Sequence, residues 1–89
     1  MTKRYLQITF RRGNPFAAYL YLPRPAGAKV ARTLVEDLGL RVDLDAQERI
    51  LGIEITAPKV VQIEDLNRLL HRFGQPALAA EEWRPALAA

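Results

Sequence analysis

The sequence predicts a small α+β domain: a single antiparallel β-meander sheet of about five strands, with one amphipathic C-terminal helix packed on one face. Two observations predict it. Between residues 6 and 56, short segments alternate apolar and polar side chains, as strands with one buried face do. Between residues 62 and 73, apolar residues instead recur every three or four positions, the spacing of an amphipathic helix. We therefore expect residues 1–89 to form a single domain.

The first two strands are predicted to form a hairpin. Residues 6–11 and residues 16–22 both alternate apolar and polar side chains, and the alternation assigns Leu6, Ile8 and Phe10 to the buried face of the first strand. The segment between them, 12–15, reads Arg-Gly-Asn-Pro and is rich in turn formers. Two prolines then remove backbone donors and interrupt the ladder, and a third strand is predicted over residues 29–36.

The fourth and fifth strands, residues 40–45 and 50–56, have the most regular alternation in the chain. Folding them about a four-residue loop sets their large aliphatic side chains on one face, and a slip of one residue would destroy that face. The expected pairs are Leu40 with Ile55, Arg41 with Glu54, Val42 with Ile53, Asp43 with Gly52, Leu44 with Leu51 and Asp45 with Ile50. In this register Ile50 alone leaves the apolar face, and both aspartates point into solvent.

The helix is predicted over residues 62–73, because acids lie near its start, bases lie near its end, and a glycine and a proline follow it. The tail, residues 75–89, is rich in alanine but contains Trp83, a large aromatic side chain that is rarely left in water. We therefore expect the tail to dock, either on its own chain or on a neighbouring molecule.

The composition is that of a folded globular domain, with 49% hydrophobic and 26% charged residues, and a cytoplasmic location is expected for the reasons that follow. No apolar run approaches the roughly 20 residues of a membrane-spanning helix. The first residues lack the pattern of a secretory signal, so export is not expected. The chain contains no cysteine, which excludes disulfides, thiolate metal sites and cysteine nucleophiles.

Charge is distributed unevenly along the chain. Residues 1–35 contain seven lysines and arginines and no acid, whereas the remainder contains all ten acids and six bases. Such asymmetry suits an anion-binding face. However, the bases are spread singly along the strands, and opposite charges on neighbouring strands can cancel, so this interpretation ranks second.

The acidic residues of the fourth and fifth strands resemble two kinds of site. Asp43 and Asp45 match the first ligands of a calcium loop, but Glu48 stands where that loop needs a glycine, and the alternation that follows demands a strand. As a catalytic pair they would need different environments, and both are expected in solvent. His71 is the only histidine and there is no serine. We predict no metal, no cofactor and no catalytic residue; an enzyme using Asp43, Asp45 and Glu54 ranks last.

The remaining candidates are contact residues. Tyr5, Tyr19 and Tyr21 are expected on the outer face of the sheet with Arg11 and Arg32 beside them, a combination that suits a protein partner or stacked bases. The residues chosen for contact are Tyr19, Tyr21, Trp83, Leu87, Arg11 and Arg32. The leading hypothesis is a non-enzymatic interaction module that forms a homodimer. The alternatives are a partner protein from a neighbouring gene, or a nucleic-acid-binding or antitoxin-like protein using Arg4, Arg11, Arg12 and Arg32.

Residues 16–57 resemble a small bacterial family known as domain of unknown function 2283. The resemblance rests on the strand Ala-Tyr-Leu-Tyr-Leu at 18–22, on Asp43 and Asp45, and on Gly-Ile-Glu-Ile at 52–55. The family turn usually carries Asp-Gly where this chain has Gln-Glu. The resemblance implies a compact meander of strands followed by a helix, no established enzymatic activity and no catalytic residues. It also implies an antitoxin-type role, because members look like neighbours of small toxin-like proteins.

Overall fold

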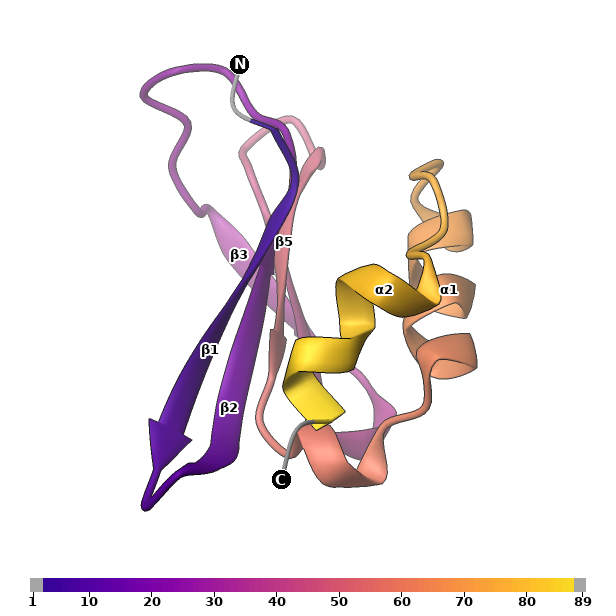
Figure 1. Ribbon diagram of the computed structural model, residues 1–89. Coiled ribbons are helices and arrows are strands. Elements are labelled where there is room, and N and C mark those ends of the chain that lie inside the picture. Colours follow the sequence, from indigo (N-terminus) through magenta and orange to yellow (C-terminus); the bar gives the residue numbers. More distant parts are fainter. Residues whose placement is uncertain (1–2, 88–89) are drawn as a thin grey trace.

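Five antiparallel strands form one sheet, and both α-helices lie on one of its faces (Figure 1). The computed structural model describes residues 3–87. The strands are β1 (Tyr5–Arg11), β2 (Asn14–Tyr21), β3 (Arg32–Val35), β4 (Leu40–Leu44) and β5 (Ile50–Ile55). The helices are α1 (Ile63–Arg72) and α2 (Ala80–Trp83), with single 3-10 turns at η1 (Asp37–Gly39), η2 (Pro58–Val60) and η3 (Arg84–Leu87). The predicted α+β class is confirmed, and the third strand is shorter than predicted.

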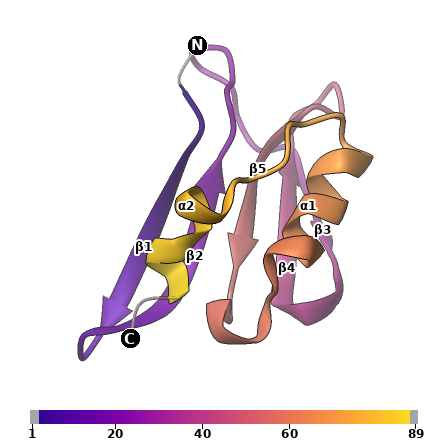
Figure 2. The same ribbon diagram turned by 45° about the vertical axis from the view of Figure 1, so that its right-hand side comes forward.

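The strand order is β1-β2-β5-β4-β3. In a simple meander β3 would follow β2 across the sheet, but here β5 takes that place and β3 forms the far edge. The long connection after β2, which contains the two prolines, carries the chain to that edge, and β3, β4 and β5 then run back toward β2 as a three-stranded meander (Figure 2). The edges of the sheet are therefore β1 and β3.

The predicted hairpin between β1 and β2 is present, but its turn is shorter than the predicted segment 12–15: it consists of Arg12 and Gly13, and β2 begins at Asn14. Both have positive φ, 53° and 81°, the backbone shape of the tight turns that match the twist of paired strands. Next to the turn, Phe10 pairs with Pro15 while Thr9 pairs with Ala17, so β2 contains one extra residue and β1 stays regular.

The register between β4 and β5 is confirmed for four of the predicted pairs, from Leu40 with Ile55 to Asp43 with Gly52. The prediction is wrong beside the loop, where Leu44 pairs with Ile50 and a bulge interrupts the ladder. The bulge turns Ile50 toward the core, where it is buried, while Leu51 is buried outside the main cluster. An extra residue in one strand reverses the facing of all that follow it, and strict alternation does not reveal it.

The core lies between the sheet and the helices. Its fully buried members include Leu20 and Leu22 of the β2 side, Ile53 of β5, and Leu66 and Leu70 of α1. Apolar residues three and four apart on α1 therefore meet alternate residues of the strands, as the two periodicities predict. Figure 2 shows α1 across the β3–β4 side of the sheet and α2 in front of β1 and β2. Within residues 3–87, no helix is both long enough and apolar enough to cross a membrane.

The tail docks on its own chain, which answers the question that the sequence left open. Trp83 is 2% exposed and belongs to the core cluster. Arg4 reaches the tail from the other end of the chain: its guanidinium donates to the carbonyl oxygens of Pro76 and Ala77 at 2.6 and 3.1 Å and to Glu82. From α1, the side chain of Asn67 exchanges two hydrogen bonds with the backbone of Leu78. The segment just before β1 and the helix α1 thus both fix the tail.

Candidate functional site

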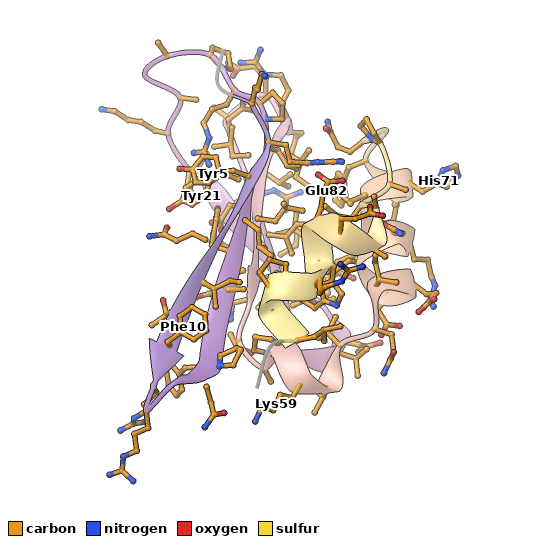
Figure 3. All side chains as sticks on the ribbon, viewed as in Figure 1. Tyr5, Phe10, Tyr21, Lys59, His71 and Glu82 are labelled. Atoms are coloured by element: carbon orange, nitrogen blue, oxygen red, sulfur yellow. The ribbon has the colours of Figure 1, made fainter. Side chains whose placement is uncertain are left out.

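Three tyrosines form a row on the face of the sheet that the helices leave open. Tyr5 of β1 pairs with Tyr21 of β2, and their rings stack with centroids 4.5 Å apart and planes 13° apart. Tyr19 lies two residues from Tyr21 on the same face, with ring centroids 4.5 Å apart and planes tilted by 51°. Figure 3 shows Tyr5 and Tyr21 on the side of the sheet opposite to Glu82 of α2. The three tyrosines therefore lie on the outer face of the sheet, as predicted.

Tyr21, in the middle of the row, is held by contacts with its neighbours on both sides. The Tyr21 hydroxyl donates to Oε1 of Gln7 at 3.1 Å, and the guanidinium of Arg24 lies 5.4 Å from the centre of the Tyr21 ring. Arg24 is itself held, because its Nη2 donates to the Leu51 carbonyl oxygen at 3.0 Å. Rings that are already ordered lose little conformational freedom on contact with a partner, and this favours them as contact residues.

Tyr19 crosses the sheet over Gly52. Its hydroxyl donates to Oδ2 of Asp43 on β4 at 2.6 Å, although β5 lies between the two strands. The crossing needs the glycine, because a Cβ at Gly52 would lie only 2.6 Å from Cζ of the Tyr19 ring. The other oxygen of Asp43 accepts from Oγ1 of Thr33 on β3, also at 2.6 Å. One line of contacts thus joins β2, β4 and β3 across the open face.

Asp43 also changes the acidity of Tyr19. Burial raises the pKa of the Tyr19 hydroxyl well above its ordinary value, and the hydrogen bond to Asp43 and the negative charge of that carboxylate raise it further. The folded protein therefore holds this proton more tightly than the unfolded chain does. The resulting stability is complete below the unfolded pKa, about 10, and is lost as the pH rises above it.

We predict that the Tyr19→Phe variant loses this alkaline dependence. Its free energy of unfolding at neutral pH should be about 1 kcal/mol lower, because one hydrogen bond to a half-buried carboxylate is lost. Above pH about 10 the wild type should lose stability with each pH unit faster than the variant. Urea unfolding at several alkaline pH values measures this. Tyr5→Phe, which removes a hydroxyl from the same row without touching Asp43, is the control; equal slopes in all three proteins would contradict the prediction.

Asp45 is buried, which corrects the prediction that it points into solvent. It is 5% exposed and organises the β4–β5 loop. Its Oδ1 accepts from the backbone N–H groups of Gln47 and Arg49, both at 2.9 Å, and its Oδ2 accepts from Nε of Arg49 at 2.7 Å. These bonds hold the pKa of the carboxyl below its usual value, and the bond from the Arg49 backbone has the largest effect. The side chain has the hydrogen-bonding pattern of a turn former and not of a metal ligand.

The acids considered for catalysis do not converge. Asp43 bonds to Tyr19 and Thr33, Asp45 bonds to its own loop, and Glu54 pairs with Arg41 at 3.8 Å on the open face. No cluster of three His, Cys, Asp or Glu side chains that could hold a metal ion occurs in the described part of the chain. His71 is exposed and projects away from the sheet (Figure 3).

A cleft with a volume of about 280 Å³ lies between η1 and α1. Four of its five charged side chains are paired with one another: Arg72 binds Glu36 through two hydrogen bonds at 2.8 and 3.2 Å, and Arg68 lies 3.4 Å from Asp65, which leaves Asp37 as the fifth. A ligand would have to replace these ion pairs in water-exposed positions. The cleft therefore offers no set of free groups that converge on a substrate.

Exposed aromatic side chains and ion pairs lie on different parts of the sheet. Three aromatic side chains are more than half exposed: Tyr5 at 51%, Phe10 at 54% and Phe16 at 52%, all on the β1–β2 hairpin. In contrast, five of the six ion pairs among residues 3–87 lie on β3, β4, β5, their loops and α1. The sixth, between Arg4 and Glu82, holds the tail. We use the name hairpin surface for Tyr5, Phe10, Arg11, Phe16 and Tyr21.

The arginines chosen for an anion-binding face do not gather in one place. Arg4 is turned toward the tail, and Arg32, on the opposite edge strand, pairs with Glu48 at 3.0 Å. Arg11 and Arg12 lie together at the tip of the hairpin, where the Arg11 guanidinium is 5.2 Å from the centre of the Phe16 ring. A phosphate backbone requires a continuous row of bases, and these four residues do not form one.

The two contact residues chosen from the tail have opposite environments. Trp83 is enclosed in the core of its own chain, so its indole is not on a surface that a partner can reach. Leu87, at the end of η3, is 56% exposed. Because η3 packs beside β2, Leu87 extends the apolar character of the hairpin side of the molecule.

Two features of this region were missed by sequence reasoning. Phe10 was assigned to the buried face, but it lies at the end of an edge strand where the helices do not cover it, and its edge position is a property of strand order. The role of Gly52 was also missed. A glycine inside a strand, as Gly52 is inside the isoleucine-rich β5, is a recognised signal for close approach of another group, and it could have indicated the position of Tyr19.

No family model, no curated protein and no solved structure matches this chain. The resemblance of residues 16–57 to domain of unknown function 2283 therefore stays a prediction.

Proposed function

We propose that the protein is a non-enzymatic interaction module that self-associates through the hairpin surface. The observation that carries this proposal is the gathering of the most exposed aromatic side chains on the β1–β2 hairpin, whereas most ion pairs of the described residues lie on the other half of the molecule. Aromatic and arginine side chains are the types most enriched in protein interfaces. Tyr5, Tyr21 and Arg11 lie on the open face of the hairpin and Phe10 on its other face, so the exposed aromatic side chains flank the edge strand β1 on both faces. A cytoplasmic location, which the cysteine-free sequence suits, belongs to the proposal.

A second copy is the partner favoured by the size of the chain. An 89-residue domain buries a smaller share of its surface than a large one and gains from association. The absence of acids in residues 1–35 is the feature that would favour nucleic acid instead. The dispersal of the arginines and the ion pair of Arg32 argue against that partner.

Light scattering after size-exclusion chromatography, over a range of protein concentrations and at low and moderate salt, tests the proposal. We expect a monomer–dimer equilibrium that salt changes little, since apolar contact carries it. Phe10→Gln should raise the dissociation constant about thirtyfold, because each of the two copies loses about 1 kcal/mol of apolar burial.

Val35→Gln is the matched control, because Val35 is a still more exposed apolar residue on the opposite edge strand. It should leave the dissociation constant unchanged. A protein that stays monomeric at the highest attainable concentration, or that binds nucleic acid with a steep loss of affinity as salt rises, would overturn the proposal.

A further inference from the structure

The edge strand β1 lacks, from Tyr5 to Phe10, the features that normally prevent strands from pairing between molecules, and its one charge is at the last position, Arg11. It runs for seven residues, and between Tyr5 and Phe10 it contains no proline, no glycine and no charge. The other edge, β3, has four residues, and its Arg32 is paired with Glu48. Edge strands present unpaired N–H and C=O groups, and natural proteins protect them with charges, prolines, bulges or short length. β3 has two of these protections, whereas the bulge beside β1 lies in β2 and leaves β1 regular.

The sequence of β1 is complementary to itself when reversed about Ile8. In an antiparallel pair centred there, the apolar residue Leu6 faces Phe10 of the second copy, and Ile8 faces itself. On the other side of the strand, Gln7 faces Thr9 and Tyr5 faces Arg11. Directly opposed residues lie on the same face of a sheet, so each pair is a favourable combination: two apolar pairs, one polar pair and one arginine–aromatic pair.

We infer that two copies pair antiparallel along β1, about a two-fold axis at Ile8, and so join their sheets into one continuous sheet. This inference rests on the proposed self-association and specifies its geometry. The pairing keeps the helices of both copies on one face, and it covers Phe10, now 54% exposed, with the half-buried Leu6 of the other copy. The interface is symmetric, as closed homodimers require.

Other registers are poorer. A shift of the axis to Gln7 sets Phe10 against Arg4 and Lys3 against Arg11, and a shift to Thr9 sets Leu6 against Arg12. An axis between two residues opposes the apolar face of one copy to the polar face of the other. In the Ile8 register the one unfavourable pair is Arg4 with Arg12, and the Arg4 guanidinium is turned away to Pro76 and Glu82.

A charge exchange tests the register. Arg11→Glu should raise the dissociation constant roughly tenfold, because two arginine–tyrosine contacts are lost for each dimer. Adding Tyr5→Arg should restore it, since the introduced arginine then faces the introduced glutamate of the second copy. Within one chain these positions are six residues apart on a strand, about 20 Å, so a restored affinity reports contact between molecules. Arg12→Glu makes the same charge change outside the arginine–tyrosine pair and should not weaken the dimer tenfold.

Cross-linking tests the axis independently of affinity. The natural chain has no cysteine, so Ile8→Cys introduces a single thiol, and on a two-fold axis the two thiols of a dimer face one another. Mild oxidation should give a disulfide-linked dimer, whereas Arg11→Cys, whose two copies lie far apart in this register, should stay uncross-linked. Preserved Trp83 fluorescence checks that each variant is folded.

The outcomes separate this inference from the proposed function. If the wild-type protein is monomeric, both the proposed self-association and the β1 pairing are wrong. If the wild type is a dimer but Arg11→Glu does not weaken it and Ile8→Cys does not cross-link it, the β1 pairing is wrong. Self-association then uses another part of the hairpin surface. Weakening by Arg11→Glu without rescue by Tyr5→Arg would overturn the Ile8 register.

Discussion

Gly52→Ala should lower the free energy of unfolding by about 2–4 kcal/mol, although glycine to alanine in a strand is usually neutral or stabilising. The reason is the Tyr19 ring, which occupies the space that the new methyl group would need. Gly52 is not among the glycines with positive φ, so the backbone itself accepts alanine. The ring must therefore move off the sheet, and the hydrogen bond between Tyr19 and Asp43 is lost with it.

A double-mutant cycle separates this steric effect from a general weakening of β5. In a Tyr19→Ala background the ring is absent, so adding Gly52→Ala should cost less than about 0.5 kcal/mol. Urea unfolding followed by circular dichroism gives all four free energies. Additive losses in the two single variants would show that the glycine acts independently of the tyrosine.

Trp83→Ala should be the most damaging single change, with a loss of about 3–5 kcal/mol. The indole is 2% exposed and lies in the cluster that joins the tail to the sheet. A domain of this size has a total stability of roughly 4–13 kcal/mol, so the variant should be largely unfolded at moderate urea or on mild heating. Circular dichroism is the appropriate signal, because the chain contains only one tryptophan.

Leu87→Ala is the matched control for the tail. Leu87 lies one turn further along, and it is 56% exposed, so its truncation should change the stability by less than about 0.5 kcal/mol. Trp83→Phe should fall between the two, because it keeps an aromatic ring but leaves a smaller void. A Trp83→Ala protein as stable as Leu87→Ala would mean that the tail does not contribute to the core.

The predictable parts of the fold are those that depend on near neighbours in the sequence. The Arg12-Gly13 turn, the pairing from Leu40 with Ile55 to Asp43 with Gly52, and the start of α1 at Ile63 all follow from local patterns of apolar residues and turn formers. The position of β5 between β2 and β4 does not, because strands that are close together or far apart in the sequence pair by the same rules.

The candidate site was predictable in part for the same reason. Alternation placed Tyr19 and Tyr21 on the outer face, but it also placed Phe10 under the helices and Asp45 in solvent. The exposure of Phe10 depends on which strand forms the edge of the sheet. The burial of Asp45 depends on a bulge that a regular pattern does not show. The contact of Arg4 with Glu82 joins residues 78 positions apart, beyond the range of any periodicity.

The central place of β5 governs how the chain assembles. Its two neighbours, β2 and β4, are both synthesised before it, and neither can bond to the other. While the nascent polypeptide ends before residue 50, it contains only two separate two-stranded ribbons, which are marginal in water. The fifth strand closes the gap between them at a single step, and so the protein should acquire its structure late, all at once, after most of it has left the ribosome.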